Sequence, residues 1–244
     1  MLDLPFFLDT LSTLIGGVPL TLQLTVLSVS SGAMLAFALA LMRVSGNPLL
    51  DYPARFYIFA FRGTPVLVQI YIVYYGLSQF PVLRQSMLWP FLREAYWCAV
   101  IALALNTAAY SAELIRGGLN SVAVGQIEAA RALGMSRPLA FRRIILPQAF
   151  RQMLPAYSNE IILMVKSTAL ASTITLLEVT GLAAKLISQS YRPVEVFIGA
   201  GAIYLTINFL IARLCAALQT ALSPEKRAAP APAQSPETEA PRHG

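Results

Sequence analysis

Residues 18–42 read VPLTLQLTVLSVSSGAMLAFALALM and contain no charged side chain. An α-helix needs about 20 apolar residues to cross the hydrocarbon core of a bilayer, so this segment is long enough to span a membrane. Of the 244 residues in the chain, 57% are hydrophobic and only 12% are charged. Such a composition excludes a disordered main body and leaves too few charges to cover a soluble domain. The chain is therefore predicted to be a polytopic membrane protein.

Four further segments have the length and hydropathy of a span. They are Phe56–Leu77 with Arg62 near its start, Ala95–Ala112, Gln152–Leu177 with Glu160 and Lys166, and Val196–Leu222 with Arg213. We therefore predict an all-α fold with five transmembrane helices in a domain over residues 18–222. Residues 1–17 form an N-terminal segment, which lacks the basic start of a signal peptide.

The distribution of Lys and Arg predicts the orientation, because cytoplasmic loops carry an excess of both. With the N-terminus outside, the inner side holds Arg43, Arg55, Arg131, Arg137, Arg142, Arg143, Arg151, Arg213, Lys226, Arg227 and Arg242. The outer side then holds only Arg84, Arg93, Lys185 and Arg192. We therefore predict an N-out, C-in arrangement with residues 1–17 in the periplasm.

The remaining composition excludes several classes of site. Cys98 and Cys215 have no CxxC partner and are predicted to be packing residues, while the lone histidine is His243. Neither a metal centre nor a cofactor bound by this chain is expected. The net charge of +6 is explained by cytoplasmic loops, so no nucleic-acid partner is predicted. The chain ends AAPAPAQSPETEAPRHG, and residues 223–244 are predicted to be a disordered cytoplasmic tail.

Small residues recur at every fourth position in two predicted spans. The two sets are Gly32, Ala36 and Ala40, and Ala104, Ala108 and Ala112. This spacing allows helix backbones to approach closely. We favour packing within the subunit over an interface between subunits.

The predicted cytoplasmic loop, residues 117–151, is too long to be without structure of its own. Residues 126–133 (QIEAARAL) are rich in helix formers, and Gly134 follows them as a helix stop. Ser136 is a candidate N-cap for a second short helix with Pro138 in its first turn. The Leu146–Pro147 pair is expected to mark a kink into the fourth span.

Glu128-Ala129-Ala130 is followed by three residues, Gly134, nine residues and Ile144-Ile145-Leu146-Pro147. This pattern resembles the EAA loop of ABC importer permeases at every fixed position and spacing. The resemblance implies a short coupling helix that docks on a separate ATPase through Glu128, Ala129, Ala130 and Gly134, with Ile144, Leu146 and Pro147 completing the motif. The alternative is an amphipathic helix lying on lipid, but such a helix normally carries bulky apolar residues where this one carries alanine.

Several other segments resemble the polar amino acid permeases. They are FRGTP at 61–65 followed by Val68-Gln69, NTAAY at 106–110, LPAYSNE at 154–160 and KSTAL at 166–170. The last two are most similar to the subgroup that imports histidine, lysine, arginine, ornithine and opines. The resemblance covers residues 10–222, with a departure at Ala123, where the family commonly has proline.

The resemblance implies the type I ABC importer permease fold in a bacterial inner membrane, surrounded by lipid. It implies a second permease subunit, two ATPase subunits that bind ATP and magnesium, a periplasmic binding protein and an amino acid substrate moved by alternating access. The chain itself would be a transport subunit and not an enzyme. Two alternatives are an ion-gradient-driven secondary amino acid transporter, which an inverted repeat would have favoured, and an intramembrane enzyme.

Polar residues inside predicted spans are candidate substrate contacts. Asn159, Lys166 and Thr173 are seven apart and share one predicted helical stripe, with Glu160 and Ser167 beside it. Glu160 is expected either to attract a substrate ammonium or guanidinium group or to pair with Arg62. Lys166 is expected to attract a substrate carboxylate or to neutralise a neighbouring acid.

Two further polar residues, Asn106 and Tyr110, lie one turn apart in the third predicted span. They either line the same path or form hydrogen bonds between helices. Arg62 and Glu113 are expected to mark the cytoplasmic boundary.

Overall fold

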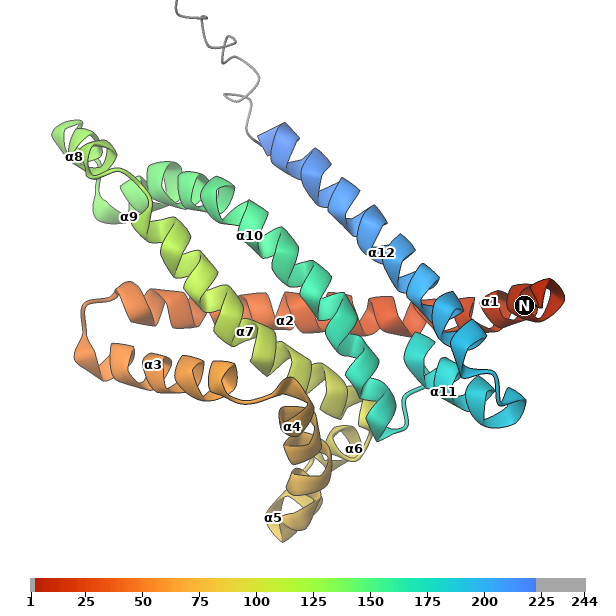
Figure 1. The fold of residues 1–244 in the computed structure, drawn as a ribbon. Coiled ribbons are helices and arrows are strands. Elements are labelled where there is room, and N and C mark those ends of the chain that lie inside the picture. The colour runs from red at the N-terminus through yellow and green to blue at the C-terminus, as the bar shows by residue number, and fades with distance from the viewer. Residues whose placement is uncertain (1–2, 223–244) are drawn as a thin grey trace, which may run out of the picture.

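A computed structural model describes residues 3–222, and every regular element in that range is a helix (Figure 1). The predicted tail at 223–244 lies outside the described residues. The elements are α1 (Leu4–Ile15), α2 (Val18–Val44), α3 (Pro48–Gly63), α4 (Val66–Tyr71), η1 (Ile72–Gly76), η2 (Leu77–Gln79), α5 (Pro81–Arg84), α6 (Trp89–Leu92), α7 (Ala95–Asn120), α8 (Val124–Ala132), α9 (Arg137–Ala140), η3 (Phe141–Ile145), α10 (Leu146–Ser167), η4 (Thr168–Ile174), α11 (Val179–Ser190) and α12 (Pro193–Leu222). The predicted all-α class is confirmed.

Three helical segments are individually long and apolar enough to cross a membrane: Leu4–Val44, α7 and α12. Two others qualify only as bent pairs. Pro48–Gly63 and Val66–Gln79 meet at 106°, and Arg137–Ile174 meets Val179–Ser190 at 48°. The described residues therefore hold three such helices, or five spans if each bent pair crosses once.

The second predicted span, Phe56–Leu77, is wrong as a continuous helix. α3 ends at Gly63, and Thr64 adopts an extended conformation with φ −118° and ψ 144°. Pro65 explains the break, because its ring disfavours helical geometry in the preceding residue and it has no N–H to donate. Hydropathy alone did not reveal the break, although the proline was visible.

The fourth predicted span is also bounded differently. At Leu146–Pro147, where a kink is predicted, a π-helical turn (η3) leads directly into α10, and Pro147 occupies its first turn, where no N–H is needed. The α-helix ends at Ser167 and continues as the 3-10 helix η4, after which Thr175 is left-handed with φ 73°. Thr173 lies in η4 and is exposed, as Asn159 and Lys166 are.

The small-residue stripes pack α2 against α7 within the subunit, as favoured. A side chain at Gly32 would place its Cβ 2.3 Å from Thr107 Cγ2 and 2.9 Å from the Ala104 carbonyl oxygen. Four of the alanines, Ala36, Ala40, Ala108 and Ala112, are fully buried. The two helices therefore touch with almost no side chain between them.

A second packing point joins α2, α11 and α12 around a buried carboxylate. Glu178 caps α11, where its Oε1 accepts a hydrogen bond from the Gly181 N–H at 2.9 Å. Its Oε2 accepts from the Tyr204 hydroxyl at 2.6 Å and from the Thr21 hydroxyl at 3.5 Å. The Tyr204 and Thr180 hydroxyls lie 3.0 Å apart. We refer to Glu178, Thr21, Thr180, Gly181 and Tyr204 as the Glu178 cluster.

The N-terminal segment is helical and packs on this region. Leu14 of α1 is fully buried, and Asp3 caps α1 and pairs with Arg192 at 3.0 Å. At the junction with α2, a side chain on Gly17 would put its Cβ 2.6 Å from the Val179 backbone nitrogen. Glycine there allows the backbones to meet.

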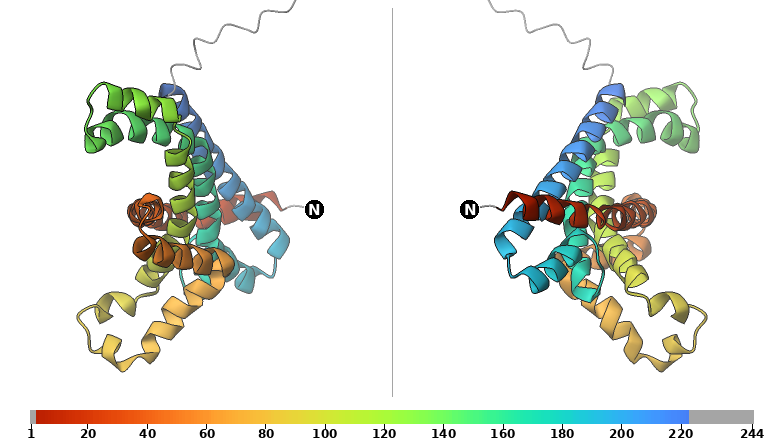
Figure 2. Two further views of the ribbon diagram at one scale, coloured as in Figure 1. Left: turned by 90° about the vertical axis from the view of Figure 1, so that its left-hand side faces the viewer. Right: turned by 90° about the vertical axis from the view of Figure 1, so that its right-hand side faces the viewer.

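The helices α7, α10 and α12 run between two ends of the molecule, and α2 lies across them (Figure 1). In Figure 1 and in both views of Figure 2, α8 and the C-terminal end of α12 lie at the top. The short helices α5 and α6 and the connection from α10 to α11 lie at the other end. The two predicted sets of loop arginines on these elements are therefore far apart.

Candidate functional site

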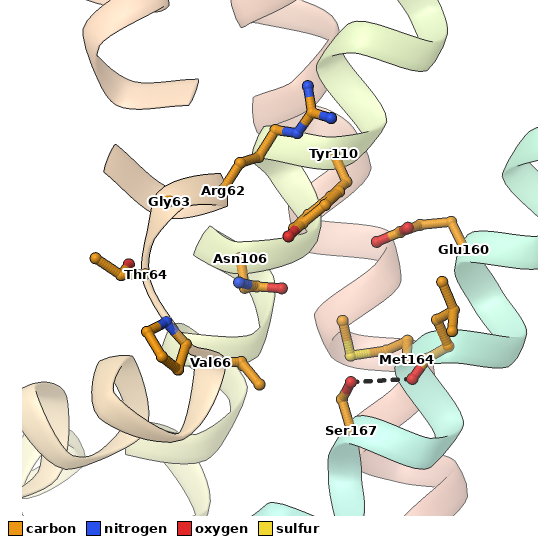
Figure 3. A pocket seen from close by; sticks show the side chains of 11 residues that line it. Arg62, Gly63, Thr64, Val66, Asn106, Tyr110, Glu160, Met164 and Ser167 are labelled. Carbon is orange, nitrogen blue, oxygen red and sulfur yellow. Dashed lines mark hydrogen bonds between the residues drawn. The ribbon is translucent and has the colours of Figure 1, made fainter. Parts of the chain in front are cut away.

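A cavity of about 460 Å³ opens where the break between α3 and α4 faces α7 and α10 (Figure 3). Its lining residues are Arg62, Gly63, Thr64, Pro65, Val66, Asn106, Tyr110, Glu160, Leu163, Met164 and Ser167. Irregular backbone at membrane depth is tolerated where it is buried in protein or lines a cavity, so the break and the cavity belong together.

The structure brings four of the predicted path residues to this cavity: Asn106, Tyr110, Glu160 and Ser167. Arg62 joins them, although the sequence favoured a boundary role for it. Lys166 and Asn159 do not join them. Both are exposed in this chain, and Lys166 lines a separate hollow with Gly201, Tyr204 and Asn208 of α12. Consecutive residues on an α-helix point about 100° apart, so Glu160 and Ser167 face the cavity while their preceding neighbours face away.

The charged groups of the cavity have few partners. The Thr107 hydroxyl donates a hydrogen bond to Glu160 Oε1 at 3.0 Å. The Arg62 guanidinium lies over the Tyr110 ring, 5.2 Å from its centroid, a cation–π geometry. Within residues 3–222 no ion pair of 4.0 Å or less joins Arg62 to Glu160, although their charges attract each other over a longer distance, so the choice between the two predicted roles of Glu160 stays open.

Gln69, in α4, completes the polar groups around the helix break. Its Nε2 donates to the Phe61 carbonyl at 2.8 Å, to the Thr64 carbonyl at 3.1 Å and to Thr64 Oγ1 at 2.8 Å. Its Oε1 accepts from Asn106 Nδ2 at 3.0 Å. The amide thus donates hydrogen bonds to carbonyl groups that have no intrahelical partner because the helix is broken there. The motif at 61–69 contains Gln69, but the motif alone predicts no role for it; the signal in the sequence is a glutamine four residues after Pro65.

The hydrogen bond between Asn106 and Gln69 also resolves one alternative. Asn106 was expected either to line the path or to hydrogen-bond between helices; it makes the hydrogen bond to α4 and also lines the cavity. Tyr110 lines the cavity beneath Arg62.

At the other end of the molecule, α8 carries the predicted coupling residues. Glu128 and Ala129 are exposed, whereas Ala130 is 1% exposed and packs inward, so only the first two lie on the outer face. Gly134 ends the helix with φ 72°. The Met135 N–H bonds the Ala130 carbonyl at 3.0 Å and the Gly134 N–H bonds the Arg131 carbonyl at 2.9 Å. This is a Schellman motif, and it confirms the predicted glycine stop.

The rest of the motif lies where the chain enters the bundle. Ile144 belongs to η3, and Leu146 and Pro147 begin α10. Ile144 and Leu146 are half-buried and Pro147 is exposed, so these residues position α8 on the bundle more than they form its outer face. Ser136 precedes α9 but makes no side-chain cap.

Glu113 anchors a group of ion pairs among α2, α3 and α7. It pairs with Arg116 at 2.8 Å and with Arg43 at 3.3 Å, and Arg43 also binds Asp51, which pairs with Arg55 at 2.7 Å. These contacts are compatible with the boundary role predicted for Glu113.

Apolar helices around a cavity with charged lining residues, and an exposed short helix at one end, are features expected of a membrane transport protein. Residues 28–224 match the family described as the binding-protein-dependent transport system inner membrane component, and the chain belongs to this family.

Similar proteins indicate which kind of transport system within this family the chain resembles. The octopine transport system permease protein OccM of Rhizobium meliloti is 71% identical over 224 residues, covering 91% of each chain. The nopaline transport system permease protein NocM of Agrobacterium fabrum is 51% identical, covering 93% of this chain and 95% of its own. A crystal structure of an amino acid ABC transporter with histidines has a chain 36% identical to this one, with a TM-score of 0.79 over 90% of this chain and 98% of that one.

The chain is therefore the permease subunit of an amino acid or opine ABC importer. This assignment removes the ion-gradient-driven transporter and the intramembrane enzyme as readings of the sequence.

Proposed function

We propose that this permease carries guanidinium-bearing substrates, arginine-type amino acids and their opines, through the cavity beside Glu160. The observation that carries the proposal is the position of Glu160: its carboxylate lines a cavity at a helix break, with one hydrogen bond from Thr107 and no ion pair to Arg62. A carboxylate with free acceptor capacity in a membrane protein is matched to a cationic ligand group.

The opposite charge in the cavity suggests how the substrate lies. Arg62 offers a guanidinium to a substrate carboxylate, while Glu160 faces the cationic end. An opine such as octopine is an arginine derivative with two carboxylates and one guanidinium group, so it offers partners to both residues. The names of the two opine permease relatives support this substrate class.

The test is uptake by the complete importer in proteoliposomes, with the ATPase and one preparation of binding protein. Glu160→Gln should lower uptake of arginine and octopine at least about tenfold, because a charge-assisted hydrogen bond is lost. Asn159→Ala is the matched control, since it changes the preceding residue on the face away from the cavity. Full uptake by Glu160→Gln, with normal amounts of folded protein, would contradict the proposal.

The membrane arrangement is proposed as five spans with the N-terminus outside and the C-terminus inside in a bacterial inner membrane. The separation of α8 and its arginines from α5 and α6 supports this arrangement. It is tested by adding cysteines at Met87 and Leu133, which are 95% and 77% exposed. An impermeant maleimide applied to spheroplasts should label Met87→Cys, and should label Leu133→Cys only after permeabilisation. The opposite pattern would reverse the orientation.

The proposed partners are a second permease subunit, two ATPase subunits that bind ATP and magnesium, and a periplasmic binding protein. In this arrangement ATP is hydrolysed on the ATPase subunits, the permease has no catalytic residue, and the ATPase drives alternating access through α8. The exposed positions of Glu128 and Ala129 support a docking face there.

The docking helix is tested at Gly134, where φ is 72° and a Cβ would meet nothing within 4 Å. Gly134→Ala should reduce substrate-stimulated ATP hydrolysis and uptake several-fold, because alanine disfavours the left-handed conformation by about 1–2 kcal/mol. Gly134→Asn should retain most activity, since asparagine tolerates that conformation. The control is Gly125→Ala in the same helix, where space is also open and φ is not positive. Equal activity of Gly134→Ala and Gly125→Ala would contradict the role given to the helix end.

A further inference from the structure

We propose that Gln69 is a positioning residue that fixes the Asn106 amide with its oxygen toward the cavity, and thereby selects ligands whose cationic end carries only hydrogen-bond donors. The proposal rests on the proposed function, because it assumes that the cavity beside Glu160 holds the substrate.

The first step is the orientation of the Gln69 side chain, which is buried with 6% exposure. Its nitrogen faces the carbonyl oxygens of Phe61 and Thr64. It also faces Thr64 Oγ1, whose own proton is donated to the Ala60 carbonyl at 2.9 Å, so this oxygen can only accept. Rotating the amide by 180° would set an oxygen against three acceptors. The nitrogen is therefore held toward the helix break.

The second step transfers this orientation to Asn106. With the Gln69 nitrogen facing the break, Gln69 Oε1 faces α7, and a group beside it must donate. Asn106 meets this requirement with Nδ2 at 3.0 Å. Figure 3 shows the consequence: the Asn106 nitrogen (blue) points toward the α3–α4 side, and its oxygen (red) points toward α10.

The third step concerns the other polar atoms on that side of the cavity. Ser167 donates its hydroxyl proton to the Leu163 carbonyl at 3.0 Å, so its oxygen is left as an acceptor. Glu160 is a carboxylate that accepts from Thr107. Asn106, Glu160 and Ser167 thus present acceptors to one cavity, whose side-chain donors are on Arg62 and Tyr110. A guanidinium group carries five N–H donors and no acceptor, and suits this wall.

The same wall disfavours a close neutral analogue. The ureido group of citrulline has nearly the shape of guanidinium but replaces one nitrogen with an oxygen. That oxygen would face acceptors and lose its hydrogen bonds to water, and sites built for particular hydrogen bonds reject such analogues strongly. The ratio of arginine uptake to citrulline uptake therefore reports the direction of the Asn106 amide.

The experiment measures that ratio in proteoliposomes holding the complete importer, with one preparation of binding protein for all variants. Gln69→Leu should lower the ratio about tenfold, because Asn106 can then turn its nitrogen toward the ligand. Gln79→Leu is the matched control, since it makes the same change at an exposed glutamine that does not line the cavity.

The outcomes separate this inference from the proposed function. If Glu160→Gln lowers the ratio and Gln69→Leu does not, the positioning role of Gln69 is overturned, whereas the assignment of the cavity as the substrate site is retained. If neither variant changes the ratio, the substrate site itself is overturned.

A second pair of variants covers the case in which Gln69→Leu does not enter the membrane. Asn106→Ala removes the oxygen that faces the cavity and should lower the ratio about tenfold, whereas Leu105→Ala, at the preceding residue outside the cavity lining, should keep it. The reverse ranking of these two variants would also overturn the inference.

Discussion

Glu160 and Glu178 are both carboxylates among apolar helices, yet their surroundings differ in kind. Glu178 is 0% exposed, and the Gly181 N–H and the Tyr204 and Thr21 hydroxyls donate to its two oxygens. Glu160 lines a cavity and receives one hydrogen bond, from Thr107. The difference teaches that an intramembrane acid marks a binding site when part of its hydrogen-bonding capacity is left facing open space. An acid whose oxygens are all engaged by the protein holds helices together instead.

The largest expected effect is on the stability of the Glu178 cluster. Glu178→Ala leaves the Gly181 N–H without its cap and removes the acceptor of Tyr204, which should lower the free energy of unfolding by about 3 kcal/mol. Thermal unfolding of the purified protein in nanodiscs measures this loss. Glu94→Gln, at an exposed glutamate, is the control. If Glu178→Ala is as stable as the wild type but does not transport, the structural role is contradicted and Glu178 acts in substrate binding instead.

A smaller loss is expected where α2 meets this cluster. Gly17→Ala would place a Cβ 2.6 Å from the Val179 backbone nitrogen, and overpacking of this kind costs about 2 kcal/mol. The same unfolding measurement applies. Gly201→Ala serves as the control, because a Cβ at that glycine meets nothing within 4 Å. Similar melting temperatures for the two variants would mean that the contact at Gly17 is loose.

Glu160→Gln should change stability by less than about 1 kcal/mol, because glutamine keeps an oxygen for the Thr107 hydroxyl and no ion pair of 4.0 Å or less is lost. Its effect should instead fall on arginine uptake, as described above. Loss of folded protein to the extent seen in Glu178→Ala would remove the distinction between the two glutamates.

The smallest effect is expected at the exposed ion pair of Asp3 and Arg192. The hydrogen bond from Arg192 lowers the pKa of the Asp3 carboxyl below its ordinary value near 4. A lowered pKa in the folded state means that the pair stabilises the fold above that ordinary value and loses its effect as the pH falls through the lowered one. The small difference in melting temperature between wild type and Asp3→Asn should therefore be constant from pH 5 to 8 and shrink below pH 4. A difference that grows on acidification would contradict this assignment.

The parts of the fold that were predictable are those with a local cause. Long segments without charged residues predicted α2 and α7. Small residues at every fourth position predicted the contact between these two helices. A glycine after a run of helix formers predicted the end of α8. The break at Thr64–Pro65 was also local in cause, but the hydropathy of residues 56–77 hid it. The sequence shows Pro65 and Gln69. Only the structure shows that the Gln69 amide binds the carbonyl groups on the α3 side of the break.

The sequence by itself determined that this chain is an apolar helical protein with few intramembrane charges and a fully spaced coupling motif, because length, hydropathy and motif spacing are properties of consecutive residues. Only the tertiary structure decided which of those polar residues meet. It placed Arg62, Asn106 and Glu160 around one cavity and turned Asn159 and Lys166 away from it. The physical reason is that a one-residue step rotates a side chain by about 100°, and that the unused hydrogen-bonding capacity of a group depends on neighbours distant in the sequence.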